Sequence, residues 1–427
     1  MTVRRAASTP AQAGSLADRF ARPGPWVVAV VIAGLISAMT FPGQTAGLSA
    51  FTDPLIAQLG ISRTSITFSY LIGTLVGAAA QPFVGRALDR WGARRVGVVV
   101  ASCFALIVLG LSFATNIVGL TVGFVGIRMA GQGALSLTAT TAIARAVHHR
   151  RGLALGITSA IGAAGVSLAP VGLERLLHFT GYVTTWRLEA LAIALVVVPL
   201  ALLLPRAAPP VAQAPGQPAA GPSWTLSEAT RSGMFWVLAA AVASSSMLGT
   251  GLAFNQIAIL GERGLTPLEA AANFLPQTLT TLLATLLTGA LVDRVSPRLV
   301  MAFAMTTLAA GMLMLSVVGP GWSGIAYGLV LGAAGGSLRG IEVATYVRYY
   351  GLTHIGAIRG VAISIALAAS AFGPLALALG QDIAGDFTRP TMVLAVIPLA
   401  VAVLALTVRP PRLRSTERTR SRRAAAA

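Results

Sequence analysis

Twelve apolar segments recur along this chain of 427 residues, and most of them are about 20 residues long. A helix needs about 20 predominantly apolar residues to cross a membrane, whereas a spanning barrel strand has about 10 residues that alternate in polarity. The segments are continuous, so the sequence predicts an all-α membrane protein with twelve transmembrane helices. The predicted helices cover residues 26–49, 65–84, 96–115, 118–142, 153–173, 188–204, 234–260, 271–292, 299–318, 322–345, 361–380 and 390–408. The first either ends near a break at Phe41-Pro42-Gly43 or extends beyond it toward Leu59.

The composition excludes two other classes of protein. Hydrophobic residues make up 55% of the chain and charged residues only 10%. Soluble domains carry about 25% charged residues and need that polar surface to cover a core. A water-soluble enzyme is therefore excluded, and the high apolar content excludes a disordered chain.

The arginines are distributed unevenly between the two sides of the predicted membrane. All 31 basic residues are arginine, of which 24 lie in the termini and the loops on their side and five in the opposite loops. Positive residues accumulate in cytoplasmic loops, so both termini are expected in the cytoplasm and the protein in the inner or plasma membrane. This orientation accounts for the net charge of +18 without any binding of nucleic acid.

A polar stretch rich in proline, alanine and glutamine divides the predicted helices into two groups of six. Its composition is typical of a linker, and Thr225 with Glu228 fits a capping box for a short helix after it. The arginine-rich tail is expected to contact anionic lipid. The sequence therefore predicts a cytoplasmic N-terminal segment, an N-terminal bundle, a linker, a C-terminal bundle and a cytoplasmic tail, at residues 1–24, 25–204, 205–232, 233–408 and 409–427.

The two groups of helices carry an internal repeat. A shift of 204 residues aligns Gly60-Ile61-Ser62 with Gly264-Leu265-Thr266, and five identical pairs follow in the same register without a gap. The pairs are Gly85 and Gly289, Asp89 and Asp293, Arg90 and Arg294, Arg94 and Arg298, and Val96 and Val300. The chain is therefore predicted to be a duplicated six-helix unit, an arrangement known among transporters built from parallel repeats.

The segment from Gly85 to Arg95 resembles the G-x-x-x-D-R-x-G-x-R-R loop of the major facilitator superfamily, and its weaker copy falls in the matching loop of the second half. Glycine permits a tight turn there, and aspartate can cap a helix and pair with arginine. The resemblance implies twelve helices in two pseudo-symmetric six-helix bundles that rock to alternate access. It also implies that this loop and its copy govern the conformational change without touching substrate. The implied residues are Gly85, Asp89, Arg90, Gly92, Arg94 and Arg95, with Gly289, Asp293, Arg294 and Arg298.

Three further stretches resemble the monocarboxylate-porter and oxalate/formate-antiporter branch of that superfamily. They are His149 to Ile157, Trp224 to Trp236 and Arg348 to Gly360. The resemblance implies that the substrate is a small organic anion. The predicted helices 8 and 11 contain no arginine or lysine, although members of that branch hold carboxylates with a cation there.

Three ionisable residues fall well inside predicted helices: Arg128 in the fourth, and Arg339 with Glu342 in the tenth. Ionisable groups in a membrane are costly and mark functional sites, and in the family fold both helices line the central cavity. A guanidinium binds a carboxylate through two hydrogen bonds, and a carboxylate near arginine can titrate. We therefore expect Arg128 or Arg339 to bind the anion and Glu342 to carry a proton. Alternatively, Arg128 bonds to carbonyls or a structural partner, and Arg339 and Glu342 neutralise each other on one helical face.

Polar side chains at the same expected depth add candidates for substrate contact: Gln44, Asn255 and Gln256. Each is alternatively a hydrogen-bond partner between helices.

His148-His149 and the lone Cys103 have no neighbours at metal-ligand spacing, and no nucleotide-binding fingerprint occurs, so the sequence predicts no enzyme, metal site or cofactor.

The expected function is secondary active transport of a small organic anion, by a monomer in the lipid bilayer, with proton coupling or exchange. One alternative is a proton-coupled exporter of amphipathic compounds, which a large apolar cavity would favour. Another is a membrane sensor that binds a solute without moving it.

Overall fold

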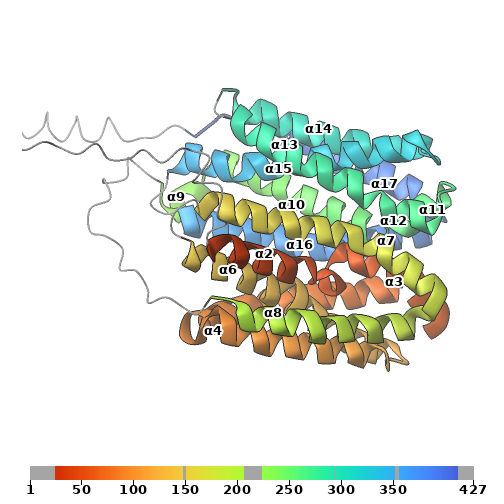
Figure 1. Ribbon diagram of the computed structural model, residues 1–427. Helices are drawn as coiled ribbons and strands as arrows, with labels where there is room; N and C mark the ends of the chain where they lie inside the picture. The colour runs from red at the N-terminus through yellow and green to blue at the C-terminus, as the bar shows by residue number, and fades with distance from the viewer. Residues whose placement is uncertain (1–24, 148–150, 206–223, 293, 352–354, 412–427) are drawn as a thin grey trace, which may run out of the picture.

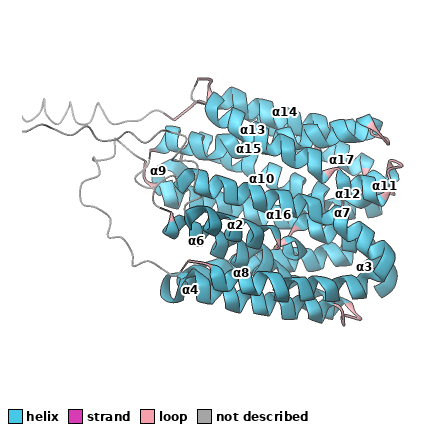
Figure 2. Ribbon diagram, in the orientation of Figure 1, coloured by secondary structure: helices cyan, strands magenta, loops and turns pink. Residues whose placement is uncertain are grey.

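The computed structural model describes residues 25–147, 151–205, 224–292, 294–351 and 355–411. Helices account for nearly all of the described residues, and no strand occurs among them (Figures 1 and 2). The predicted N-terminal segment, most of the linker and most of the tail lie outside the described residues, as do His148 and His149.

The first half of the chain forms helices that run back and forth along one axis (Figure 1). In chain order they are α2 (Pro25–Ala38), η1 (Phe41–Gly43), α3 (Thr45–Leu59), α4 (Arg63–Leu111), α5 (Ile117–Ile127), η2 (Arg128–Leu135), α6 (Ser136–Ala146), α7 (Arg151–Ala192), η3 (Ile193–Val197) and α8 (Val198–Leu203).

The second half repeats the arrangement after the linker. Its elements are α9 (Leu226–Thr230), α10 (Gly233–Phe254), α11 (Gln256–Glu262), α12 (Pro267–Ala272), α13 (Phe274–Leu291), α14 (Pro297–Met314), η4 (Leu315–Val317), α15 (Trp322–Tyr350), α16 (Ile355–Ala384), α17 (Thr388–Leu394) and α18 (Val396–Thr407). The capping box that the sequence predicts at Thr225 and Glu228 is present at the start of α9.

Eight described helical stretches are long and apolar enough to cross a membrane. Two of them each contain two predicted spans, because α4 leaves helical geometry at Gly92 and α7 at Gly181, where φ is +79° and +72°. The pair α2 and α3 and the helix α15 complete twelve among the described residues. The prediction of an all-α membrane fold with twelve helices in two six-helix bundles is confirmed.

The first helix continues beyond the break that the sequence marks. Gly43 ends the short turn η1, and α3 then runs to Leu59. The backbone approaches closely at this point, because a Cβ added to Gly43 would lie 2.3 Å from the carbonyl oxygen of Ile127. Only glycine fits here, so the broken first helix is pressed against the start of η2.

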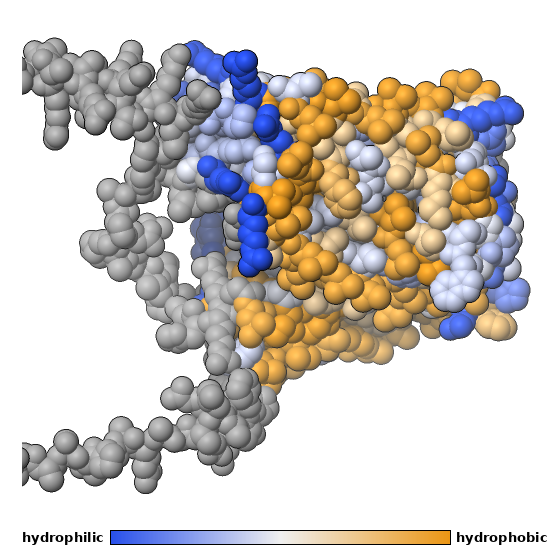
Figure 3. Space-filling model, turned by 90° about the horizontal axis from the view of Figure 1, so that it is seen from above, coloured by the Kyte–Doolittle hydropathy of each residue, from blue (hydrophilic) through white to orange (hydrophobic). Residues whose placement is uncertain are grey.

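The surface divides into an apolar belt and two polar ends (Figure 3). Leucines such as Leu286 and Leu287 are 73% and 70% exposed in the belt. Such a wide apolar surface needs lipid around it. The end at which α8 ends and α9 begins is called the linker end below, and it lies at the left of Figure 1; the opposite end, with α11, α12 and α17, is called the far end.

Small residues bring α15 into close contact with α13. Gly332, Gly336 and Gly340 recur at every fourth position, and Cβ atoms added to them would lie 2.2–2.6 Å from carbonyl oxygens of α13. Thr281 and Thr285 donate hydrogen bonds back to the carbonyls of Gly332 and Gly336, both at 3.1 Å. This packing fixes the rotation of α15 and so decides which of its residues face the space between the halves.

Candidate functional site

A cavity of about 620 Å³ lies between the two halves of the protein. Residues of α3, η2 and α7 border it on one side, and residues of α10, α11, α13, α15 and α16 on the other. A smaller cavity of about 330 Å³ adjoins it and shares Gln132 and Leu367 with it. The volume of the larger cavity, about 620 Å³, falls in the range of small-molecule sites. The space between the halves is therefore the candidate binding site.

Side-chain contacts join the halves at the far end and at the wall of this cavity. Among the described residues two hydrogen bonds join the halves: Thr64 donates to Asp382 at the far end, and Ser167 bonds with Thr278. The rings of Tyr70 and Phe254 also meet across the halves, with centroids 4.6 Å apart. The cavity is therefore closed toward the far end.

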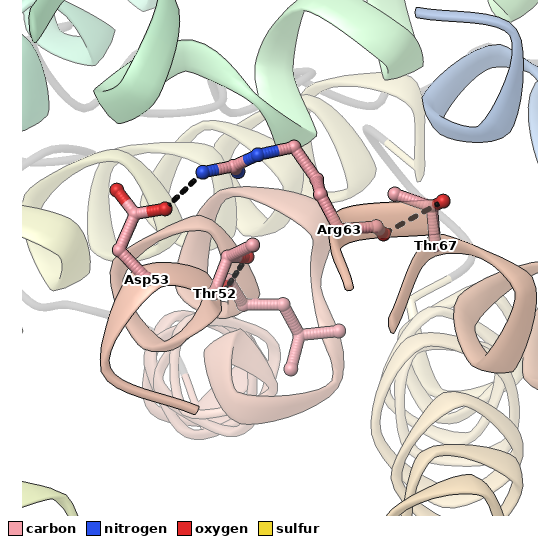
Figure 4. Close-up of polar contacts among 5 residues, drawn as sticks. Thr52, Asp53, Arg63 and Thr67 are labelled. Carbon is pink, nitrogen blue, oxygen red and sulfur yellow. Dashed lines mark hydrogen bonds and ion pairs between the residues drawn. The ribbon is translucent and has the colours of Figure 1, made fainter. Parts of the chain in front are cut away.

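An arginine strengthens this closed end. The Arg63 guanidinium points at Asp53 and forms an ion pair with it, while the Arg63 backbone carbonyl accepts from Thr67 (Figure 4). The same guanidinium lies 5.5 Å from the centroid of the Phe387 ring, which belongs to the other half. Arg63 thus ties α3 and α4 to the opposite bundle.

Arg128 is buried, and each of its contacts is to the first half. Its Nε donates to the Thr74 hydroxyl and its Nη1 to the carbonyl of Gly43, both at 3.1 Å. Its guanidinium carbon lies 4.4 Å from the centroid of the Tyr70 ring. The side chain borders the smaller cavity and not the larger one. Arg128 therefore holds the break of the first helix in place, with neutral partners only.

Arg339 and Glu342 lie one turn apart on α15 but do not pair with each other. Glu342 accepts a hydrogen bond from Arg359 on α16 at 3.4 Å. Arg339 is exposed to the large cavity and has no hydrogen-bond or ion-pair partner among the residues that the structure describes. Among the described residues, Arg339 is thus a cation on the wall of the cavity without an ion-pair partner.

Amide side chains form a chain of hydrogen bonds beside the cavity. Gln277 donates to Gln256 at 2.8 Å and to Asn273 at 3.1 Å, and Gln256 donates to the carbonyl of Ala270 at 2.9 Å. Of the amides that the sequence predicts as candidates for substrate contact, Gln256 and Gln44 border the cavity. Asn255 does not border it, because that side chain is buried and donates to its own helix at Gly251.

The repeated loop of the first half lies at the linker end, at the break of α4. Arg145 on α6 forms an ion pair with Asp89 and donates to the carbonyl of Leu88 at 3.1 Å. Gly92 is buried with φ +79°, a conformation that favours glycine. Of the other predicted members, Arg90 and Arg95 are exposed, Arg94 is half-buried, and Gly85 has open space where a Cβ would be.

The copy of this loop has related but not identical contacts. Arg348 donates to the carbonyl of Val292, which stands 204 positions after Leu88. Arg298 donates to the carbonyl of Val408 at 3.2 Å, and Arg294 is exposed. Gly289 again has open space at the Cβ position. Asp293 lies outside the described residues.

Sequence reasoning missed Arg359. The apolar pattern predicts that the eleventh helix begins at residue 361 and places this arginine in a loop, whereas α16 begins at Ile355 and carries it against α15. Arg145 and Arg348 were counted only as loop charges, although they bind matching carbonyls in the two halves. The 204-residue repeat relates the carbonyls of Leu88 and Val292, and it is the sequence signal that points to these matching contacts.

Metal-ligand groups do not gather in the described part of the chain: it contains no cluster of three or more His, Cys, Asp or Glu side chains that could hold a metal ion. Cys103 is exposed and free.

Comparison with known proteins agrees with this architecture. Residues 43–276, more than half of the chain, match the family model of the Major Facilitator Superfamily. The fold resembles the inward-facing and occupied crystal structure of a bacterial homolog to the human lysosomal transporter Spinster, with a TM-score of 0.72 and 16% identity over 90% of this chain and 97% of that one. The inward-facing and unoccupied form of that homolog gives a TM-score of 0.66, at 16% identity, over 90% of this chain and 96% of that one.

Two curated relatives share a shorter stretch. The sucrose transport proteins SUT1 of Oryza sativa subsp. japonica and subsp. indica are each 31% identical over 90 residues, which is 19% of this chain and 16% of theirs. The chain therefore aligns with about one sixth of the length of these relatives. The family match, the twelve-helix fold and the cavity between two halves agree, and the chain belongs to the Major Facilitator Superfamily.

Proposed function

We propose that the protein is a secondary active transporter of a small organic anion. The observation that carries this proposal is Arg339, a guanidinium on the wall of the cavity between the halves that has no ion-pair partner in the described part of the chain. A cation at membrane depth without a partner is costly, and a guanidinium binds a carboxylate through two hydrogen bonds. An anionic substrate supplies the missing partner.

Glu342 is the proposed carrier of a coupled proton. It borders the same cavity, and its partner Arg359 is 3.4 Å away with 30% of its side chain exposed. A carboxylate held by a weak pair beside a wet cavity takes up a proton when its arginine turns away or when the cavity changes sides. Arg339, the proposed anion-binding residue, lies one helical turn from Glu342. Binding of the anion and uptake of the proton therefore take place close together.

The cavity is closed toward the far end, which suits a mechanism of alternating access. Side-chain contacts join the halves at the far end, and with the termini in the cytoplasm this end faces outward. In that orientation the structure is inward-facing. Rocking of the two bundles around the cavity would then expose Arg339 to the other side.

The unpaired charge argues for an anion over other substrates. The name of the SUT1 relatives points to a neutral sugar, but their match covers about a sixth of their length, and a neutral sugar leaves Arg339 without a counter-charge. A cavity with an arginine, a glutamate and several amides on its wall also suits an anion better than an amphipathic compound.

Flux through proteoliposomes tests the proposal. Radiolabelled monocarboxylates and dicarboxylates are tested as a panel; at least one of these anions should be taken up, and an inward proton gradient should change its rate. Arg339→Gln should lower uptake at least tenfold, and Arg339→Lys should restore part of it, because lysine keeps the charge but not the forked geometry. The matched control is Arg389→Gln, an exposed arginine at the far end that pairs with Asp386 and donates to the carbonyl of Ala384.

Two outcomes would overturn this proposal. Equal uptake by Arg339→Gln and by the control would show that the anion does not depend on the free cation. Anion binding without flux would make the protein a membrane sensor instead.

A further inference from the structure

We infer that the substrate is a hydroxylated monoanion, such as a sugar acid, rather than an apolar carboxylate. This inference rests on the proposed function and extends it to the class of anion. It is carried by the polar groups around the large cavity that have no partner in the described part of the structure.

The first group is a stripe of hydroxyls on α10. Ser245, Ser246 and Thr250 border the cavity, are half-buried, and form no hydrogen bond with any described residue. Serine and threonine in helices commonly donate to the carbonyl of the preceding turn, as Thr74 and Thr138 do here. The three hydroxyls on α10 do not, so they are free to bind what fills the cavity.

The second group consists of glutamine amides on both sides of the cavity. Gln132 in η2 makes no hydrogen bond with described residues, and Gln44 donates only to Thr40, at 3.0 Å, so its Oε1 has no partner. Gln277 uses its nitrogen for Gln256 and Asn273, and its Oε1 likewise has no described partner. Donors and acceptors are both available, as a hydroxylated ligand requires.

The charge of the cavity sets the charge of the ligand. Arg339 and Glu342 are its charged lining residues among those described, and Glu342 is already paired with Arg359. One positive charge remains, which matches one carboxylate. A dianion would bring a second charge without a partner, and a neutral sugar would leave the guanidinium unpaired.

The neutral polar groups then discriminate among monoanions. An apolar tail would displace water from the three hydroxyls and the amides without replacing the hydrogen bonds, which costs binding free energy at each group. A site built to bind hydroxyl groups rejects analogues that lack them more strongly than an apolar pocket rejects a small change of size. The volume of about 620 Å³ accommodates a six-carbon acid with its hydroxyls.

The test compares three probes of similar size: gluconate, hexanoate and glucose. We expect purified protein in proteoliposomes to bind and transport gluconate at least tenfold better than hexanoate, and glucose not at all. Ser246→Ala and Thr250→Val should each weaken gluconate binding about tenfold and leave hexanoate unchanged, since each removes one hydrogen bond to a hydroxyl. Thr307→Val is the matched control, because Thr307 is half-buried on α14, does not border the cavity and bonds to its own helix at Phe303.

A second variant separates binding from folding. A Cβ at Gly335, on the cavity wall one turn before Arg339, would meet nothing within 4 Å. Gly335→Ala therefore adds a methyl group to the ligand space without a clash, and it should weaken gluconate binding while the melting temperature does not fall below that of the wild type.

The outcomes distinguish this inference from the function it rests on. Hexanoate transported as well as gluconate, with both dependent on Arg339, would overturn the hydroxylated class and leave the anion transporter standing. If glucose binds as well as gluconate and Arg339→Gln has no effect, both the hydroxylated class and the anion transporter are overturned. Failure of gluconate to bind, or equal loss of both anions in Ser246→Ala and Thr250→Val, would also overturn the inference.

Discussion

Glu342 accepts its hydrogen bond from Arg359 on the neighbouring helix, although Arg339 stands one turn before it on its own helix. The choice of partner leaves Arg339 free in the cavity, and it makes Arg359 the group that neutralises Glu342. Arg359→Gln should therefore unpair Glu342 and destabilise the protein by about 1 kcal/mol, a modest value because both side chains are partly exposed to water.

The double variant Glu342→Gln with Arg359→Gln measures this coupling. We expect it to recover most of the lost melting temperature, because neither charge then lacks a partner. It should not recover proton-dependent transport, which needs the carboxylate. Additive losses of stability in the double variant would contradict the pairing.

Arg128 should behave differently from Arg339 when replaced. Arg128→Gln removes two hydrogen bonds, to Thr74 and to the carbonyl of Gly43, and the stacking on Tyr70. We expect a loss of about 3 kcal/mol in unfolding free energy, since buried acceptors are left unpaired. Thermal unfolding in detergent checks this against Arg339→Gln, for which we expect a wild-type melting temperature. Equal melting temperatures of the two variants would contradict the structural role of Arg128.

Much of the fold was predictable, because apolar runs, the break at Phe41-Pro42-Gly43 and the 204-residue repeat are local or periodic signals. The sequence also predicts the depth of Gln44, Gln256, Arg339 and Glu342, since the family fold assigns depth to each helix, but it does not predict which of these side chains border the cavity.

Pairing between side chains was not predictable. Arg359 lies 17 residues after Glu342, and its place depends on where α16 begins and on how α15 is rotated by glycine contacts with α13. Hydropathy locates a helix but does not fix its rotation or its first turn. For the same reason the sequence could not show that Arg128 faces carbonyl and hydroxyl groups while Arg339 faces the cavity.

The break of α4 offers a direct test of the loop at the linker end. Gly92 is buried with φ +79°, so Gly92→Ala forces a side chain into the left-handed region and should cost more than 1 kcal/mol. Gly85→Ala is the matched control, because a Cβ there meets nothing within 4 Å and the residue is helical. Thermal unfolding should show a lower melting temperature for Gly92→Ala and an equal or higher one for Gly85→Ala. The opposite order would contradict the assigned backbone.

Glu189 is a buried carboxyl group that stability measurements can examine. It is 4% exposed, and neither of its oxygens has a hydrogen-bond partner in the described part of the structure. Replacing a buried unpaired group by an apolar one of similar volume relieves its desolvation cost, so Glu189→Met should stabilise the protein by about 1–2 kcal/mol. Glu262→Met should do the reverse, because Glu262 accepts a hydrogen bond from the backbone N–H of Phe387 at 2.9 Å. A lower melting temperature for Glu189→Met would show that the carboxyl group has a favourable role.

The hydrogen bond between Thr64 and Asp382 predicts how the far end opens. It joins the two halves beyond the cavity, whereas Asp386, four residues later, pairs with Arg389 inside one half. Asp382→Ala should therefore shift the population toward a state that is open at the far end, and Asp386→Ala should not. In a Cys103→Ala background, the thiol introduced by Ser246→Cys on the cavity wall reports access from the far side. We expect an impermeant thiol reagent added on that side to label it several times faster with Asp382→Ala, and an unchanged labelling rate would show that this contact does not hold the halves together.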